Sequence, residues 1–322
     1  MKAKLLHFTK RDDFVSLAIV VVMVLVLSIT SPIFWSASNM DSLIYAVSRN
    51  AIVAFGMMMV LVCGYFDLSV GNIMLLSSLS SACFVYLGCS APVAIVGGIV
   101  VGALCGMLNG FLVAVVGVNA LIATVGTQYM FYGMAMTIYE WAKQVKELPE
   151  AFYNISWLKF LGMEPYIWCM LILAVVFSIY MKYTCSGRQL YCIGGNREAA
   201  RQMGYAIRGK VFACYTVLGV LAAIAGIFAM ARIKNPSQNI GTDMQMTCII
   251  ACIVGGGSFA GGKGKISGAL FGILFISLLS NMFNLWEVKS MFQNMTLGLV
   301  LIAVLTLDGW LSIRRLRNLG KI

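Results

Sequence analysis

The chain has 322 residues, of which 61% are hydrophobic and only 11% are charged, and its mean hydropathy is +0.90. This small number of polar side chains cannot cover the surface of a water-soluble globule. The composition therefore excludes a soluble protein and predicts a surface that faces lipid. The net charge of +11 would suit a nucleic-acid partner in a soluble chain, but in a membrane protein it has to be compared with the topology first.

Apolar segments recur along the whole chain, each of roughly 17 to 25 residues, which is the length that crosses the hydrocarbon core of a bilayer. They leave no stretch for a separate soluble domain. Residues 1–322 are therefore predicted to form a single all-α transmembrane domain with about ten transmembrane helices. The predicted spans are 14–30, 43–63, 69–88, 92–117, 119–139, 166–182, 211–231, 246–259, 266–283 and 291–310.

The basic residues favour one orientation of these spans. Most of the 23 lysines and arginines fall on the side that holds both termini. Because cytoplasmic loops carry the excess of positive charge, both termini are predicted to be cytoplasmic. Topology thus accounts for the net charge, and the predicted partner is the lipid bilayer, with no nucleic acid.

Two connections are longer than the others and differ in character. The outer segment 140–165 mixes acids, bases and aromatic residues, and it is a candidate for a short interfacial helix that meets an extracellular partner. The segment 183–210 is strongly basic and is predicted to be cytoplasmic, with a short helix after a Gly-Gly-Asn break. Its position and charge are typical of a docking element.

No set of residues suited to catalysis or metal binding is evident. The stretch from Gly257 to Gly264 nearly spells a phosphate-binding loop, but Gly264 replaces the required Ser or Thr and the stretch joins two membrane spans. HExxH, GxSxG and paired intramembrane carboxylates do not occur in the sequence. The ten cysteines form no CxxC pair and the single histidine is His7. The chain is therefore predicted to bind no metal and no cofactor of its own.

Polar residues within or beside the spans are the candidates for a transport path. Neutral amides and hydroxyls suit a neutral polyol, whereas a ladder of charges would suit ions. For each residue the alternative is a hydrogen bond that only holds two helices together. The single charge, on an arginine, is expected to face an aqueous cavity or to extend towards the interface. The candidates are Arg49, Asn50, Asn72, Asn109, Asn119, Thr124, Thr127, Gln128, Gln245 and Asn281.

The sequence between the second and third spans breaks the helix. In the stretch from Tyr65 to Asn72, Asp67 or Ser69 can cap the new helix by accepting its free N–H groups. Capping alone would explain both residues, and Gly71 lies two positions after Ser69.

Four motifs resemble the ribose-type permeases of ABC importers, and together they extend over essentially the whole chain. The resemblance implies a type II ABC importer permease fold in a bacterial plasma membrane. It also implies a second permease, two cytoplasmic ATPases that hold ATP and Mg, and an outer substrate-binding protein that delivers a monosaccharide. The motifs are F-D-L-S-V-G at 66–71, A-L-I-A-T-V-G at 120–126, S-G-R-Q-L-Y-C-I-G-G-N-R-E-A-A-R-Q-M-G at 186–204 and G-G-G-S-F-A-G-G-K-G-K-I-S-G-A-L-F-G at 255–272.

The third motif resembles the coupling helix that enters a cleft of the ATPase in that family. Two small alanines would allow close contact, the Gly-Gly-Asn turn would aim the helix, and a glycine would end it. The alternative is an ordinary basic loop. The residues that the resemblance assigns to coupling are Gly194, Gly195, Asn196, Glu198, Ala199, Ala200 and Gly204.

The chain departs from the family before the eighth span. Relatives commonly read G-T-G-x-E-L-D-A-I-A-A, whereas segment 241–251 has Gln245 and Thr247 in place of the two acids. The sequence therefore does not predict which sugar or polyol is carried. An ATP-independent secondary transporter or channel for a small polar solute is the alternative, although no charged ion-coupling site is evident. A membrane enzyme ranks last because no catalytic set is present.

Overall fold

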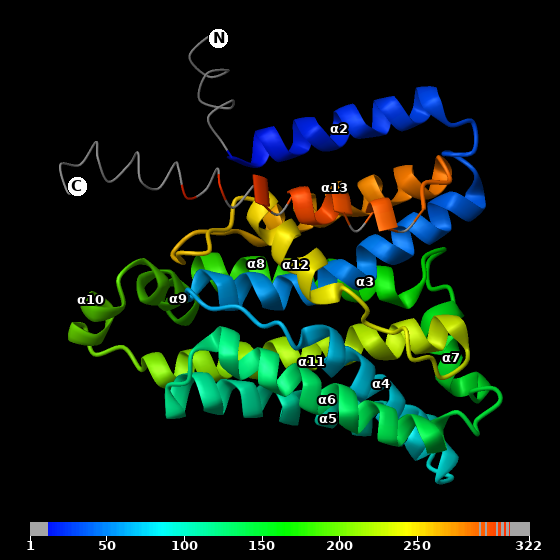
Figure 1. The fold of residues 1–322 in the computed structure, drawn as a ribbon, viewed down its shortest axis with the longest axis horizontal. Helices are drawn as coiled ribbons and strands as arrows, with labels where there is room; N and C mark the ends of the chain where they lie inside the picture. The colour runs from blue at the N-terminus through cyan, green and yellow to red at the C-terminus, as the bar shows by residue number, and fades with distance from the viewer. Residues whose placement is uncertain are drawn as a thin grey trace.

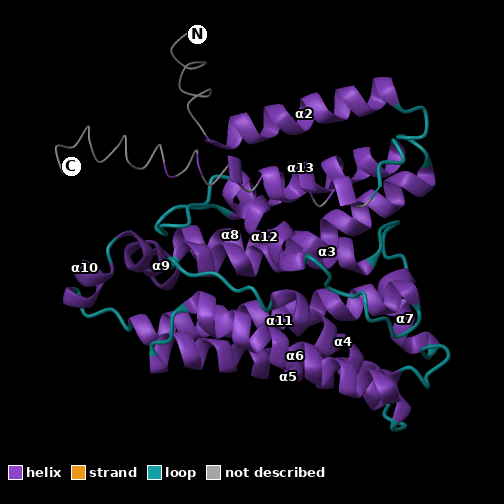
Figure 2. Ribbon diagram, in the orientation of Figure 1, coloured by secondary structure: helices purple, strands orange, loops and turns teal. Residues whose placement is uncertain are grey.

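The protein is helical throughout the part described by the computed structural model, which comprises residues 12–289, 291–293, 295–300, 302–303, 306 and 309, with side chains from residue 18. Within these residues Figure 2 shows only helices and loops, and a single isolated backbone bridge joins Phe160 and Met163. The predicted all-α class is confirmed. The helices, in chain order, are α2 (Asp12–Thr30), α3 (Ala37–Val62), α4 (Val70–Tyr86), α5 (Ala91–Gly110), a π-helical turn η1 (Phe111–Val116), α6 (Ala120–Ala142), α7 (Glu150–Trp157), α8 (Pro165–Tyr183), α9 (Cys185–Gly195), α10 (Arg197–Gln202), α11 (Ile207–Ile233), α12 (Met244–Val254) and α13 (Ile266–Leu285).

These helices follow the predicted spans in order. Five of them in the described part are long and apolar enough to cross a membrane, namely α3, α5 with η1, α8, α11 and α13. Helices α4 and α12 are shorter apolar helices, α2 has 19 residues, and α6 has 23 residues and a more polar sequence. The predicted span at 291–310 lies only partly within the described residues, and those residues are helical.

The long helices lie roughly side by side along the longest axis of the molecule (Figure 1). Helices α9 and α10 lie at one end of the bundle, which we call the α9–α10 end, and α7 lies at the other, the α7 end. Large apolar side chains point outward along the bundle, among them Val22 and Leu25 on α2, Val96 on α5 and Val175 on α8. Such outward apolar faces are suited to lipid.

Glycines bring α5 and α11 into close contact. The ridge of Gly98, Gly102, Gly106 and Gly110 faces α11, and a Cβ on any of these four would crowd atoms of α11 or α4. Gly219 on α11 faces back towards the same ridge. Because glycine has no side chain, the two backbones approach closely, which stabilises helix pairs in a membrane by packing. The glycine at every fourth residue of α5 therefore serves helix packing.

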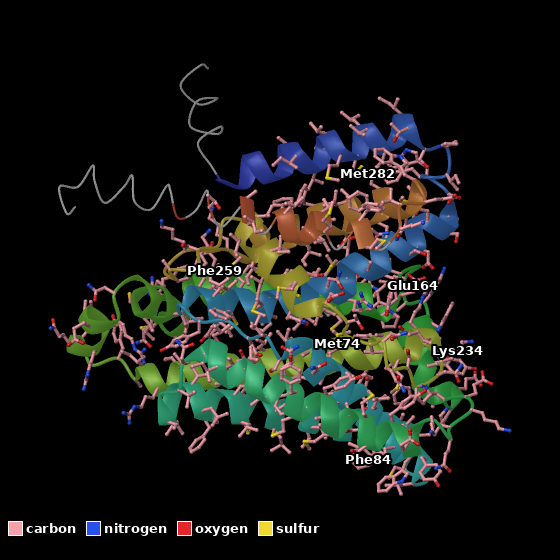
Figure 3. The ribbon with its side chains drawn as sticks, viewed as in Figure 1. Met74, Phe84, Glu164, Lys234, Phe259 and Met282 are labelled. Carbon is pink, nitrogen blue, oxygen red and sulfur yellow. The ribbon has the colours of Figure 1, made fainter. Side chains whose placement is uncertain are left out.

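Two helices begin inside the bundle instead of at one of its ends. After α3, segment 63–69 runs back along the bundle before α4 begins (Figure 1), and Met74 of α4 is fully buried at the centre (Figure 3). Segment 234–243 leads into α12 in the same way from the α7 end. Gly71 and Gly241 touch, because a Cβ on either would overlap the carbonyl oxygen of the other. The N-termini of α4 and α12 therefore meet within the bundle.

Helix α12 is shorter than predicted. It has 11 residues and ends at Val254, so the predicted span 246–259 is wrong at its C-terminal end. Gly256 follows with φ +88°, a left-handed conformation that ends the helix and that glycine adopts at little cost. Eleven residues rise about 16 Å, roughly half of the hydrocarbon thickness. The crossing is thus shared between α12 and the segments that flank it.

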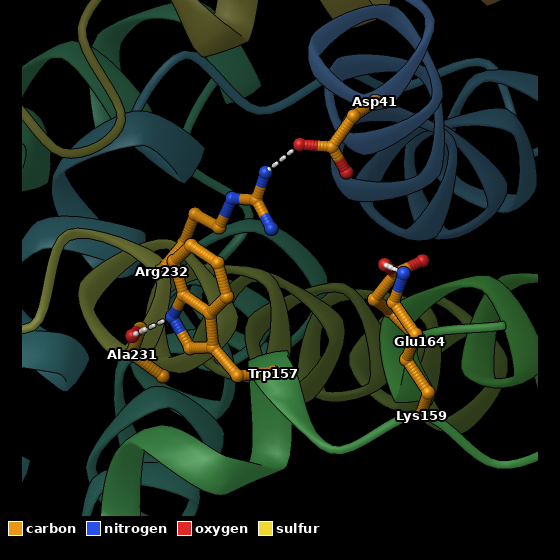
Figure 4. A network of polar contacts seen from close by, with 6 residues as sticks. All are labelled: Asp41, Trp157, Lys159, Glu164, Ala231 and Arg232. Carbon is orange, nitrogen blue, oxygen red and sulfur yellow. Dashed lines mark hydrogen bonds and ion pairs between the residues drawn. The ribbon is translucent and has the colours of Figure 1, made fainter. Parts of the chain in front are cut away.

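A polar cluster joins three helices at the α7 end (Figure 4). Arg232 of α11 forms an ion pair with Asp41 of α3, and its guanidinium lies 4.3 Å from the ring centroid of Trp157 on α7. The indole nitrogen of Trp157 donates to the Ala231 carbonyl at 3.2 Å. The predicted short helix within 140–165 is therefore present as α7, and it packs on the end of α11.

Candidate translocation and coupling sites

A polar cavity of about 310 Å³ lies where α4 and α12 begin, bordered by α6 and segment 234–243. We call it the amide groove. Side-chain amides come from all four elements, and two tyrosine rings come from α6. Its lining residues are Asn72, Leu75, Gln128, Tyr129, Tyr132, Gln238, Ile240, Gly241, Thr242, Asp243 and Gln245.

The backbone adds to the polarity of the amide groove. The first N–H groups of a helix have no partner within the helix, and they carry the positive end of its dipole. Two such helix ends meet at Gly71 and Gly241, beside the amides. Asn72 donates to the backbone carbonyl of Gln128 at 2.8 Å, which holds α6 against the start of α4. The groove thus offers donors and acceptors without lysine or arginine among its lining residues.

Three of the sequence-predicted path residues come together in this groove, namely Asn72, Gln128 and Gln245. They belong to three different helices, and only the meeting of α4 and α12 brings them into one place. Gln238, Tyr129, Tyr132, Thr242 and Asp243 were missed by sequence reasoning. The two tyrosines lie on the polar helix α6, whose low hydropathy was the available signal.

The other candidates lie elsewhere and have partners. Among them, Arg49 donates to the Asn50 side chain at 3.2 Å and lies over the Tyr45 ring at 5.6 Å. Asn281 pairs with the Asn39 side chain between α13 and α3. Asn119 caps the start of α6, where its side chain accepts from the Leu121 N–H at 2.9 Å. Within α6, the Thr124 hydroxyl donates to the Ala120 carbonyl at 2.8 Å and the Thr127 hydroxyl donates to the Thr124 carbonyl at 3.3 Å.

Asp67 is fully buried and organises the break between α3 and α4. One carboxylate oxygen accepts from both the backbone N and the hydroxyl of Ser69, each at 2.7 Å. The Asn109 amide of α5 donates to the other carboxylate oxygen at 2.9 Å and to the Ser69 hydroxyl at 2.7 Å. A buried carboxylate is costly unless it is hydrogen-bonded, and these donors supply that compensation. Asp67 thus fixes the path of the chain into α4. Ser69 occupies the N-cap position, but no side chain caps the helix there, so the predicted capping by Asp67 or Ser69 is wrong.

The predicted coupling residues lie at the α9–α10 end. Gly194 and Gly195 are the last residues of α9, so they do not form the predicted Gly-Gly-Asn turn. Asn196 alone separates the two helices, with φ −155°, and its side chain caps α10 by accepting from Ala199 N at 3.0 Å. Gly204 follows α10 with φ +77°, which suits the end of a helix.

The exposure of the α10 residues separates them into two groups. Glu198 is exposed, so it is available to a partner. Ala200 is fully buried within the chain itself, and Ala199 is half-buried. The close contacts of Ala200 are therefore with other residues of this chain and not with a partner.

Three segments meet by their backbones beside α9, at what we call the glycine junction, formed by Gly64, Gly194, Gly261 and Gly262. A Cβ on Gly194 would overlap the Val62 carbonyl oxygen, and a Cβ on Gly261 would come within 2.9 Å of Gly64 and Gly194. The Gly262 N–H donates to the same Val62 oxygen at 2.8 Å. The glycine-rich near-match to a phosphate loop therefore serves to pack the α12–α13 connection against α3 and α9.

Two aromatic residues strengthen the contact between α9, α10 and the bundle. The Tyr191 hydroxyl donates to the Gly264 carbonyl at 2.9 Å, and burial raises the pKa of Tyr191, which keeps this donor protonated. The Arg197 guanidinium lies 5.5 Å from the centroid of the Tyr65 ring, a cation–π contact from α10 to segment 63–69. The segment that carries Asp67 is thus in direct contact with α10.

The architecture and these two sites define a class of protein, a multi-pass membrane permease with a helical element at one end and a polar groove within. A family model described as "Branched-chain amino acid transport system / permease component" matches residues 39–305. The chain belongs to this permease family. It is the permease component of an ABC importer and is not itself the catalytic subunit.

Named relatives cover nearly the whole chain. The ribose import permease protein of Escherichia coli strain K12 is 31% identical over 91% of this chain and 92% of its own length. The L-arabinose transport system permease protein of the same strain is 32% identical over 92% and 90%. The autoinducer 2 import system permease protein of Enterobacter strain 638 is 31% identical over 88% and 82%.

A solved structure shares the fold. A structure described as a metal-chelate type ABC transporter in an inward-facing conformation aligns with a TM-score of 0.52, covering 92% of this chain and 98% of that chain at 12% identity. At this identity the match shows the fold alone, which is that of a type II ABC importer permease. As a permease of this type, the chain works with separate ATPase and substrate-binding partners.

Proposed function

We propose that this permease carries a monosaccharide, or a polyol of similar size, through the amide groove into the cytoplasm. The observation that carries the proposal is the lining of the groove, where amides of α4, α6 and α12 gather at two helix N-termini. Amide and hydroxyl groups exchange hydrogen bonds with sugar hydroxyls one at a time, which favours both entry and release. Tyr129 and Tyr132 offer ring faces for the apolar side of a sugar.

The same lining argues against an amino acid, although the family description names branched-chain amino acids. An amino acid carries a carboxylate that favours a lysine or arginine partner, and the groove is lined by neither. Its one charged residue is Asp243. The relatives named for ribose, arabinose and autoinducer 2 support a neutral polyhydroxylated substrate.

The substrate need not be the ribose or arabinose of those relatives. Gln245, which replaces an acid of the common family pattern, lines the groove, and segment 241–243 lines it beside Gln245. A neutral amide keeps hydrogen-bonding capacity but removes a charge. We therefore expect a preference that differs from that of relatives with the acid.

Coupling to ATP hydrolysis is proposed to pass through α10 and the glycine junction. Exposed Glu198 would enter the ATPase, Asn196 would orient α10, and Gly194 would transmit the movement to α3. In this proposal two permeases pair and bind two ATPases that hold ATP and Mg. The bundle then alternates between inward-open and outward-open states, because each partner binds one state more tightly.

The orientation of the chain is part of the proposal. Both termini and the segment 183–210 are placed in the cytoplasm, and the segment 140–165 with α7 is placed outside, where the substrate-binding protein docks. The described start of α2 lies at the α9–α10 end of the bundle, which supports a common side for these elements. Residues 1–322 are proposed to work as one transmembrane domain.

The docking experiment exchanges one exposed acid. Glu198→Arg is expected to abolish capture of the ATPase in a pull-down from membranes, because a carboxylate that faces the partner becomes a cation. Glu147→Arg is the matched control, since it makes the same exchange on an exposed residue before α7. Equal capture by both variants would refute the assignment of α10.

The substrate experiment begins with the binding protein encoded beside this chain. Its ligand is identified by calorimetry against pentoses, hexoses, polyols and branched-chain amino acids. The complete importer in proteoliposomes is then expected to take up the same neutral ligand only with ATP. Uptake of an amino acid, or uptake without ATP, would overturn the proposed substrate class or the proposed mechanism.

A further inference from the structure

A second cavity, of about 690 Å³, opens at the α9–α10 end between α8, α9 and the start of α13. It lies apart from the amide groove, and the two share no lining residue. Lys182 of α8, Arg188 of α9 and Lys263 of the α12–α13 connection line it. Lys263 belongs to the near-match to a phosphate loop. The packing role of the glycines in that loop does not explain why a positive charge stands there.

The positive charge of this cavity is not balanced within the described part of the chain. The ion pairs there involve Lys143, Lys159 and Arg232, none of which lines the cavity. Lys265 also borders the cavity but has another interaction of its own. The other three cations are Lys182, Arg188 and Lys263. Gathering them in one place costs free energy through repulsion, and a bound anion would offset that cost.

The backbone of the same cavity is suited to a phosphate group. Helix α13 begins at Ile266, and its N-cap residue Lys265 makes no side-chain capping hydrogen bond. The first N–H groups of α13 therefore lack that acceptor where Ser267 lines the cavity. The Tyr191 hydroxyl, 2.9 Å from the Gly264 carbonyl, holds the connection in place. The cavity is thus built from fixed elements, with arginine and lysine as phosphate ligands.

An apolar stripe leads from this cavity along the outside of α8. Leu171, Val175, Ser178 and Lys182 follow one another at helical spacing and are all exposed, and the last two line the cavity. Only 17% of the spanning window of α8 is buried inside the bundle. A molecule with a phosphate in the cavity could therefore lay an acyl chain along Val175 and Leu171.

We propose that this cavity binds the phosphate of an anionic phospholipid, with its acyl chains along the exposed face of α8. Basic pockets between transmembrane helices recognise such headgroups through the charge and the hydrogen bonds of the phosphate. The site anchors α8, α9 and the start of α13 to one lipid next to the glycine junction. It is independent of which sugar is transported.

The test measures lipid retained by the purified full-length permease in native mass spectrometry. Phosphatidylglycerol and cardiolipin are expected to be retained in preference to phosphatidylethanolamine, which carries no net charge. The double variant Arg188→Gln, Lys263→Gln is expected to weaken phosphatidylglycerol binding roughly 30-fold, as removal of two surface cations implies.

A matched control is available at the same end of the bundle. Another cavity of about 720 Å³ is lined by Arg201 and Arg208 but also by Glu198. Arg201→Gln, Arg208→Gln removes the same charge outside the proposed site and is expected to leave lipid retention unchanged. Melting temperatures of both double variants show that each is folded. Equal loss in both would overturn the proposal, since it would indicate general attraction to a basic surface.

Two further arms distinguish the source of the phosphate. Inorganic phosphate and glycerol phosphate are added at millimolar concentration to the permease with bound phosphatidylglycerol, and no displacement is expected. Displacement would identify a site for a soluble anion and overturn the lipid assignment. Loss of the bound lipid when the ATPase is added would also overturn the lipid assignment, because acidic groups of the ATPase would then occupy the cavity.

Discussion

The glycine junction and the amide groove show opposite uses of the same bundle. At the junction, backbones of α3, α9 and the α12–α13 connection touch directly, and a Cβ on Gly194 has no room. At the groove, long amides and tyrosines from α4, α6 and α12 surround a cavity of about 310 Å³. The comparison teaches that direct backbone contact suits one region to move as a unit, whereas the open polar lining of the other suits the solute passage that we propose.

The largest effect is expected at the junction. Gly194→Ala places a methyl group against the Val62 carbonyl, and such overpacking is expected to lower the free energy of unfolding by about 1–3 kcal/mol. Gly195→Ala is the matched control, because a Cβ there meets no atom within 4 Å. Alanine in a helix is better than glycine by roughly 0.5–1 kcal/mol, so the control is expected to stabilise the protein. Melting temperatures of the two detergent-purified variants should move in opposite directions, and a shift of the same sign would contradict the close contact.

The next effect concerns the segment that links the two regions. Asp67→Ala removes the acceptor of Ser69 and Asn109 and leaves both polar groups buried without it, which is expected to cost about 1–3 kcal/mol. Asp67→Asn keeps the shape and one acceptor, so it should lose less. Thermal unfolding of both variants checks the order. If Asp67→Ala were as stable as the unmodified chain, the network would not hold the start of α4.

A smaller effect is expected at the groove. Gln245→Leu removes one neutral hydrogen-bonding group, which should raise the barrier to passage by about 0.5–1.5 kcal/mol and slow uptake up to roughly tenfold. Uptake is measured with saturating loaded binding protein, and melting temperature and ATPase capture should not change. Thr137→Leu, which changes an exposed polar residue of α6 outside the groove, is the control. An equal rate for both variants would remove Gln245 from the path.

The smallest effect is expected at the contact between α10 and segment 63–69. Arg197→Gln removes the cation–π contact with Tyr65, which is worth about 0.5–1 kcal/mol at an exposed site. The number of substrate molecules moved per ATP hydrolysed should fall roughly two- to fivefold. Arg201→Gln, on the same helix, is the control. Tyr65→Leu should give the same loss, and the double variant should lose no more, because both changes break one contact.

The sequence predicted the helices better than it predicted their ends. Apolar length placed α3, α5, α8 and α11 because a bilayer demands such lengths. It overextended α12, since apolar counting does not register the left-handed turn at Gly256. It also missed α9, because Gly194 and Gly195 read as a break, whereas α9 continues through both and Gly194 packs closely against Val62.

The sites were predictable only in part, for a physical reason. Asn72, Gln128 and Gln245 stand out as polar residues in apolar surroundings, but nothing local shows that they converge. Their meeting depends on the contact of Gly71 with Gly241, which are 170 positions apart in the sequence. Asn109 was assigned to the path as a polar residue, and its contacts are with Asp67 and Ser69.

The cluster of Arg232, Asp41 and Trp157 has a mechanical consequence. It pins α3, α7 and α11 together at the end of the bundle farthest from α10. In the proposed coupling, a push delivered at α10 would therefore tilt α3 and α11 about this pinned end. Because α4 packs against α11 and α12 packs against α3, this tilt would move helices that line the groove and so change its width.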